Sequence, residues 1–237
     1  MRNVSDFMNK QSTIPLHTGN GTQPGIGEAM KNSTINRESI YVVTKVEETD
    51  NAYERTKANL EEMDLKYTDL MLIHRPPPTG AGEQLWGGLI RAKKEGLTRD
   101  IGVSNYSAEL IQKLIEASGE VPTVNQIEWS PFGHSENMMK YCAEKNIVIQ
   151  AYSPLTRTKR LDDITLNQLA SKYNKTPAQI LIRWNLQLGT VPLPKANQKY
   201  NLKEDINVFD FEIRDNDMAL LRDLNEEYSS LGSLPYA

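Results

Sequence analysis

Six short apolar runs alternate with helix-like stretches along the 237-residue chain, and this alternation constrains the fold more than any other feature. The runs span residues 40–46, 67–74, 99–105, 123–129, 147–155 and 189–196. Most of them are continuously apolar, as strands buried on both faces are. Strands that alternate with helices indicate βαβ units and a parallel sheet. The sequence therefore predicts an α/β fold.

The stretches between these runs carry the signals of helices. Helices are predicted over residues 51–63, 83–96, 107–119, 135–146, 166–174 and 177–189. Ser107 is expected to cap the start of one helix, and Gly96 and Gly119 to end two. Pro177 in a first turn and Gly189 just after the last turn delimit another. No linker or repeat divides the chain, so one domain over residues 1–237 is predicted.

Composition excludes several classes of function. The net charge is −4 and no long basic run occurs, which argues against a nucleic-acid-binding role. No apolar stretch is long enough to cross a bilayer, and the first residues lack the apolar run of a secretory signal. Cys142 is the only cysteine, which rules out an internal disulfide and fits a cytoplasmic protein. No metal-binding motif is present, so no metal site is predicted.

Polar residues gather at the carboxyl ends of the predicted strands. They are Lys45, His74, Ser104, Asn105, Gln126, Glu128, Tyr152, Ser153 and Lys195. Alone, a strand-end lysine is more often a surface residue with a packed stem, and a strand-end histidine more often borders the core. In an α/β barrel, however, this end of the strands carries the active site. As a set, these residues predict an active site.

Several segments resemble the aldo-keto reductase family. They are "VVTKV", "LIHRP", "KKEGLTRDIGVSNYS", "NQIEWSP", "AYSPL" and "PKANQKYNLKEDINVFDF", in the family's order. The resemblance extends from about Glu28 to the carboxyl end. It implies a (β/α)8 barrel of the TIM type that transfers a hydride from NADPH or NADH to a small aldehyde or ketone.

The resemblance also implies roles for individual residues. Lys45 and His74 match the family's catalytic lysine, which lowers the pKa of a tyrosine, and the histidine that orients the substrate carbonyl. The cofactor-binding positions are Ser104, Asn105 and Gln126 at the nicotinamide amide, Tyr152 stacked on its ring, Ser153 and Leu155 near the pyrophosphate, and Lys195, Asn197, Glu204 and Asp205 near the adenosine.

The amino-terminal region departs from the family pattern. Residues 14–30 resemble the family's opening hairpin running directly into its second helix, without the segment that holds the first two barrel strands and the catalytic Asp and Tyr. An incomplete barrel of six strands plus a hairpin is therefore predicted, as a monomer or as a dimer through its open edges. No residue is assigned to the missing Asp or Tyr. Tyr41, Tyr67 and Tyr106 are the next candidates for a proton donor.

A second departure concerns the cofactor and leaves its type open. Ala196 and Asn201 stand where NADPH-dependent members usually have Ser and Arg. Three functions are compatible with the sequence. The first is a carbonyl reductase with impaired activity, and the second is an inactive nucleotide-binding pseudo-enzyme. The third is a different barrel chemistry in which Lys45 forms a Schiff base, which requires a deprotonated lysine.

Overall fold

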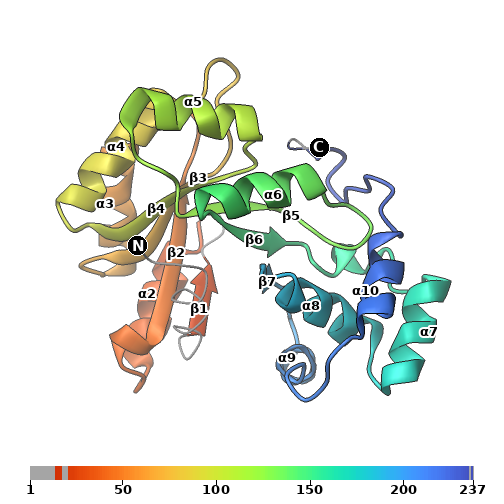
Figure 1. Ribbon diagram of the computed structural model, residues 1–237. Helices are drawn as coiled ribbons and strands as arrows, with labels where there is room; N and C mark the ends of the chain where they lie inside the picture. Colours follow the sequence, from red (N-terminus) through yellow and green to blue (C-terminus); the bar gives the residue numbers. More distant parts are fainter. Residues whose placement is uncertain (1–13, 18–20, 235, 237) are drawn as a thin grey trace. The chain divides into compact units, whose positions relative to one another are not determined.

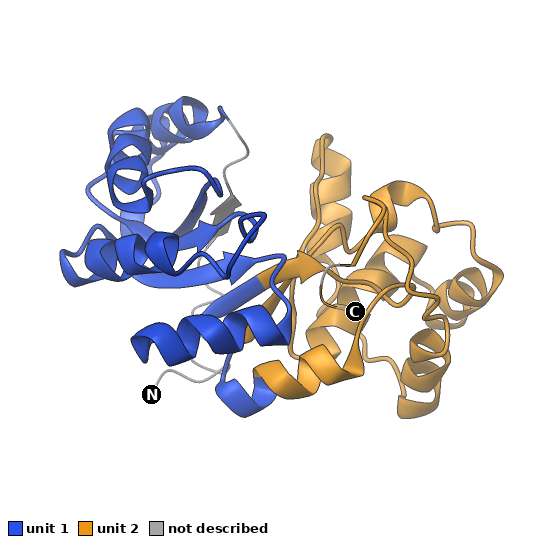
Figure 2. Ribbon diagram, turned by 90° about the horizontal axis from the view of Figure 1, so that it is seen from above, with its two compact units in different colours: residues 1–125, 143–147 blue, residues 126–142, 148–237 orange. Residues whose placement is uncertain are grey.

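The computed structural model describes residues 14–17, 21–234 and 236, and it shows strands and helices that alternate along the chain (Figure 1). The chain divides into two compact units (Figure 2). Unit 1 comprises residues 1–125 and 143–147, and unit 2 comprises residues 126–142 and 148–237. The single domain predicted for residues 1–237 stays a prediction.

Parallel strands form the centre of unit 1. In chain order they are β1 (Ile14–His17), β2 (Ile40–Val46), β3 (Thr68–Ile73) and β4 (Thr98–Ser104), and each pairs with the next in parallel. The connecting helices are α2 (Gln23–Asn32), α3 (Ala52–Met63), α4 (Glu83–Lys94) and α5 (Ala108–Ser118), with a short 3-10 turn, η2 (Arg37–Ser39), before β2. This arrangement confirms the predicted βαβ units.

The segment predicted as an opening hairpin has a different structure where it is described. Ile14 lies opposite Ile40 in a parallel pair, and the helix α2 begins at Gln23. The helix α2 carries the chain back to the end of the sheet where β1 began, so β2 runs in the same direction as β1. A Cβ atom on Gly27 would lie 2.5 Å from the carbonyl oxygen of Met63, so glycine allows α2 to pack closely on α3.

The core of unit 1 follows from the apolar runs. All six residues of β3 are buried, and Val42 and Val43 of β2 are fully buried. Trp86 and Leu89 cover this core from α4.

The predicted signals for helix ends are also confirmed, because the Ser107 hydroxyl accepts a hydrogen bond at the start of α5. Gly96 and Gly119 adopt the positive φ that ends a helix.

Unit 2 is built around a second parallel pair. Its elements are β6 (Val148–Tyr152), η3 (Thr156–Thr158), α7 (Ile164–Tyr173), α8 (Pro177–Gln187), β7 (Val191–Leu193), α9 (Lys199–Ile206) and α10 (Asp215–Arg222). β6 and β7 pair in parallel. The division between the units crosses β5 (Val124–Glu128) and α6 (Glu136–Lys145). Within the described residues, no helix has the length and apolar character needed to span a membrane.

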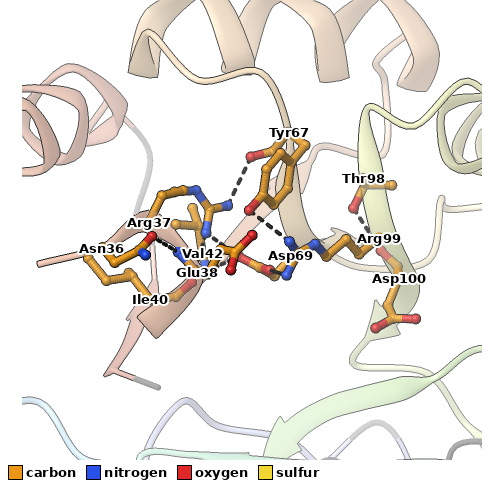
Figure 3. A network of polar contacts seen from close by, with 10 residues as sticks. All are labelled: Asn36, Arg37, Glu38, Ile40, Val42, Tyr67, Asp69, Thr98, Arg99 and Asp100. Carbon is orange, nitrogen blue, oxygen red and sulfur yellow. Dashed lines mark hydrogen bonds and ion pairs between the residues drawn. The ribbon is translucent and has the colours of Figure 1, made fainter. Parts of the chain in front are cut away.

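A buried carboxylate ties together the amino-terminal ends of three strands in unit 1. Asp69 of β3 is 1% exposed, and its oxygens lie 2.8 Å from the Arg37 guanidinium and 3.0 Å from that of Arg99 (Figure 3). One Asp69 oxygen also accepts a hydrogen bond from the backbone N–H of Val42 at 2.9 Å. Both guanidinium groups lie over the ring of Tyr67, at 4.2 and 4.4 Å. The same three strands carry predicted catalytic and cofactor-binding residues at their opposite ends.

Candidate active site

Lys45 is a partly buried cation near the carboxyl end of β2. Burial lowers the pKa of its ammonium group from 10.5 to about 8, although the nearby Glu47 carboxylate opposes this shift. Its backbone carbonyl accepts a hydrogen bond at 3.0 Å from the Asn59 side chain, which is fully buried in α3. Lys45 is therefore held at the strand end and still carries its charge near neutral pH.

His74 follows β3 and pairs with a carboxylate. Its backbone N–H donates to the carbonyl of Val46 at 2.9 Å, which continues the ladder between β2 and β3. Its Nδ1 lies 2.7 Å from Oε2 of Glu47. The two side chains are 26% and 36% exposed, so a small molecule can reach the pair from solvent.

Asn105 and Ser104 support His74 from the end of β4. Asn105 has a φ of 63°, a left-handed conformation that asparagine tolerates better than most residues. Its amide nitrogen donates to the carbonyl of His74 at 2.9 Å and to the Ser104 hydroxyl at 3.2 Å. The structure thus brings four predicted residues together around Glu47, and we call Lys45, Glu47, His74, Ser104 and Asn105 the strand-end group.

Glu47 is the member of the strand-end group that sequence reasoning missed. Val46 of β2 lies opposite Ile73 of β3 in the parallel register. The residues that follow them, Glu47 and His74, therefore face each other. The signal available in the sequence was a carboxylate directly after an apolar strand, in "KVEE". The strand lengths alone did not reveal which residue near the end of β3 the Glu47 carboxylate would contact.

The residues of unit 2 that are predicted to bind the nicotinamide and the pyrophosphate differ in accessibility. Tyr152 ends β6 and is partly exposed, and Ser153 follows it with a φ of 48°. Leu155 is also partly exposed. Gln126 is only 4% exposed, and its amide nitrogen donates to the side chain of Gln150 at 2.9 Å. Tyr152, Ser153 and Leu155 are therefore open to a ligand, whereas Gln126 faces the interior of its unit.

The predicted adenosine-binding residues lie between β7 and the end of α9. Lys195 and Asn197 are exposed. Glu204 accepts a hydrogen bond from the Thr176 hydroxyl at 2.5 Å, so this carboxylate helps to fasten α9 to the start of α8. Burial, and secondly the charge of Glu204, raise the pKa of Asp205. Lys195 and Asn197 are the two residues of this set that a ligand can approach freely.

A cavity of about 540 Å³ lies between the loops that follow β2 and β3. Glu48, Asp50 and Glu83 contribute carboxylates to its lining, whereas neither Lys45 nor His74 borders it. Three carboxylates would repel the phosphates of a dinucleotide. The cavity is therefore unsuited to a cofactor of that kind and is separate from the strand-end group.

The profile of the Aldo/keto reductase family matches residues 20–226. The chain belongs to this family. An aldo-keto reductase of Mycobacterium tuberculosis is 39% identical over 211 residues, which cover 87% of this chain and 75% of the relative. An uncharacterized oxidoreductase of Bacillus subtilis, YtbE, is 37% identical over 210 residues, with the same coverage. The chain is accordingly an oxidoreductase of the aldo-keto reductase type.

Solved structures of aldo-keto reductases have the same fold. The enzyme of Bombyx mori, solved in complex with NADP, superposes with a TM-score of 0.84 at 30% identity, covering 92% of this chain and 80% of that one. An aldo/keto reductase of Brucella melitensis also gives 0.84, at 32% identity and with 94% and 87% coverage. The predicted α/β fold of the (β/α)8 type is confirmed.

The three tyrosines named as next candidates for the proton donor have different surroundings, and the donor role stays a prediction for each of them. Tyr106 is fully buried, burial raises its pKa, and its hydroxyl donates to the carbonyl of Ala81 at 3.0 Å. Tyr67 lies in the Asp69 network at the amino ends of the strands. Tyr41 is four residues before Lys45 in β2, about 13 Å away along the strand.

Proposed function

We propose that this chain is a slow NAD(P)H-dependent reductase of small aldehydes and ketones. The observation that carries the proposal is the strand-end group itself. In a member of the aldo/keto reductase family, a partly buried lysine cation and an accessible histidine stand at the ends of neighbouring parallel strands. That end is where enzymes with this fold bind substrate.

The chain's own residues have distinct parts in this reaction. The nicotinamide cofactor supplies a hydride to the carbonyl carbon when it is bound. Lys45 remains mostly a cation below about pH 8 and stabilises negative charge that develops on the carbonyl oxygen. His74 orients the carbonyl by a hydrogen bond and supplies a proton to the oxygen.

The residues of unit 2 fit a dinucleotide, which supports the choice of cofactor. Tyr152 offers a partly exposed ring to a flat heterocycle, and Lys195 offers an exposed charge to a phosphate. The relative from Bombyx mori binds NADP, which favours NADPH. Ala196 and Asn201 provide no arginine fork for a 2′-phosphate, so NADH stays an alternative.

A second candidate function is cofactor binding without turnover. The surroundings of the tyrosines favour it, because the hydroxyls of Tyr67 and Tyr106 are bonded to residues outside the strand-end group and Tyr41 lies four residues before Lys45. Positioned general acids contribute about 10²–10⁴-fold to a rate, so a reductase that lacks the tyrosine loses much of its activity. The two candidates involve the same residues and differ in whether His74 supplies the proton.

The proposal extends to the substrate, the oligomeric state and the cellular location of the protein. The substrate is a small carbonyl compound, and the chain acts as a monomer or as a dimer. We place it in the cytoplasm because its one cysteine, Cys142, is buried and free.

Steady-state assays are expected to show turnover below the ordinary range of about 1–10³ per second, since no tyrosine is assigned as the proton donor. Oxidation of NADPH and of NADH is followed with a small aldehyde, with the enzyme omitted as the control. Measurable turnover that depends on the enzyme supports the reductase. Binding of a cofactor without turnover supports the second function, and a rate within the ordinary range contradicts the missing donor.

Replacement of Tyr152 by alanine is expected to weaken cofactor binding. Loss of ring stacking costs about 0.5–1.5 kcal/mol, which corresponds to an increase in Kd of up to about ten-fold. Titration calorimetry with NADPH and NADH measures the change. Tyr53→Ala is the control, because Tyr53 lies on α3 and its hydroxyl is bonded to Glu95. Equal affinities of Tyr152→Ala and the parent protein would contradict the assignment.

A further inference from the structure

Glu47 is held opposite His74 by contacts on both sides of the pair. The backbone N–H of Glu47 donates to the Asp50 carboxylate at 2.7 Å. The backbone of His74 is fixed at its N–H by Val46 and at its carbonyl by Asn105, each at 2.9 Å. The 2.7 Å separation of Oε2 and Nδ1 is therefore the result of a supported geometry in which three strand ends take part.

The chemistry of this hydrogen bond determines which nitrogen of His74 carries a proton. An ionised carboxylate only accepts hydrogen bonds, so Nδ1 of His74 must be the donor. A neutral imidazole has one N–H, and in this pair that group is Nδ1–H. Nε2 is then an acceptor. It becomes a donor only in the imidazolium form, which carries a proton on both nitrogens.

We infer that Glu47 is a positioning residue that keeps neutral His74 in the Nδ1–H form and so allows Nε2 to donate to a substrate oxygen only when the ring is protonated. Glu47 therefore determines which protonation state of His74 can donate a hydrogen bond from Nε2 to the substrate. The tautomer itself is a property of the free protein. The consequence for catalysis rests on the proposed reductase function.

The charged groups near His74 come from two parts of unit 1. On the β2 side these are Lys45 and Glu47, and in the loops beyond the strands Arg75 lies 3.9 Å from Glu48. Asn105, which contacts His74 from just beyond β4, and Ser104, which contacts Asn105, are both uncharged. Glu47 is the carboxylate in hydrogen-bond contact with the ring. Its effect on the tautomer of His74 can therefore be distinguished from the effect of the charge on the next residue, Glu48.

Nuclear magnetic resonance of ¹⁵N-labelled histidine tests the tautomer without any need for activity. The chain has three histidines, and the His74→Gln spectrum identifies the signals of His74. His134 provides an internal reference, because its Nδ1 lies 3.2 Å from the Ser130 carbonyl and burial lowers its pKa. At a pH where the rings are neutral, we expect His74 to show the Nδ1–H form, like His134.

Two variants separate the hydrogen bond from general electrostatics. In Glu47→Ala the acceptor is gone, and we expect the Nε2–H form of His74 to become populated. In Glu48→Ala, which removes an equal charge from the next residue, we expect the Nδ1–H form to persist. An Nε2–H form in the parent protein, or the same change in both variants, overturns the inference.

The pH dependence of catalysis provides the second readout. In the parent protein kcat/KM should fall with rising pH, because Nε2 donates to the substrate oxygen only from the protonated ring. In Glu47→Ala neutral His74 can also donate from Nε2, so kcat/KM should fall less steeply with rising pH than in the parent protein. Superimposable profiles overturn the role of Glu47, whereas an inactive parent protein with the expected tautomer refutes only the reductase proposal.

Discussion

Replacement of His74 by alanine is expected to lower any carbonyl reductase activity by about 10²–10⁴-fold, the usual contribution of a positioned general acid. His74 is the accessible member of the strand-end group that can both orient a carbonyl and transfer a proton. His74→Gln should retain part of the activity, because an amide N–H still orients the carbonyl oxygen without donating its proton. The measurement is kcat/KM with a small aldehyde between pH 5 and 8.

The control for His74 is Arg75→Ala, which changes the next residue of the same loop. Arg75 is 56% exposed and is paired with Glu48 at 3.9 Å, a long and weak contact. Its removal should leave kcat/KM near that of the parent protein. If His74→Ala retains full activity, another group supplies the proton, and the role proposed for the strand-end group is wrong.

Replacement of Asp69 by alanine is expected to destabilise the protein by about 3 kcal/mol, because it leaves two arginines and one buried N–H without their acceptor. Asp69 is 1% exposed and contacts Arg37, Arg99 and the N–H of Val42. For a chain of this size the melting temperature should fall by about 6–12 °C. Thermal and urea unfolding measure the change.

Two further variants define the origin of this loss. Asp69→Asn keeps an oxygen for the N–H of Val42 but lacks the charge that pairs with the arginines, so its stability should be intermediate. Glu62→Ala removes a carboxylate that is 35% exposed and pairs with Arg55, and it should cost at most about 1 kcal/mol. Equal effects of Asp69→Ala and Glu62→Ala would show that the network contributes little.

The fold could be predicted well from the sequence because its signals are local. Each apolar run predicted as a strand contains one, and the predicted start signals Ser107 and Pro177 lie where helices begin. β1 was missed as a parallel strand because "IPLH" is only four residues long and gives no periodicity of its own. α9 and α10 were also missed. They have eight residues each, and α9 buries none of them.

The site was predicted in part. Lys45, His74, Ser104 and Asn105 were identified at strand ends, and the structure brings them together in unit 1. The cofactor roles predicted for Ser104 and Asn105 stay predictions. The Asn105 amide nitrogen is bonded to His74. Neither Glu47 nor Asn59 was noticed, because each acts through a residue that is distant in the chain.

The sequence by itself determined the alternation of strands and helices and the place of Lys45 and His74 at strand ends, because hydrophobic periodicity and capping act over a few residues. Only the tertiary structure decided that Glu47 meets His74, since this contact depends on the register in which β2 pairs with β3. Alternation of side chains fixes which face a residue occupies but not its partner on the next strand. The partner of His74, and with it the protonation of its ring, is therefore a property of the assembled sheet.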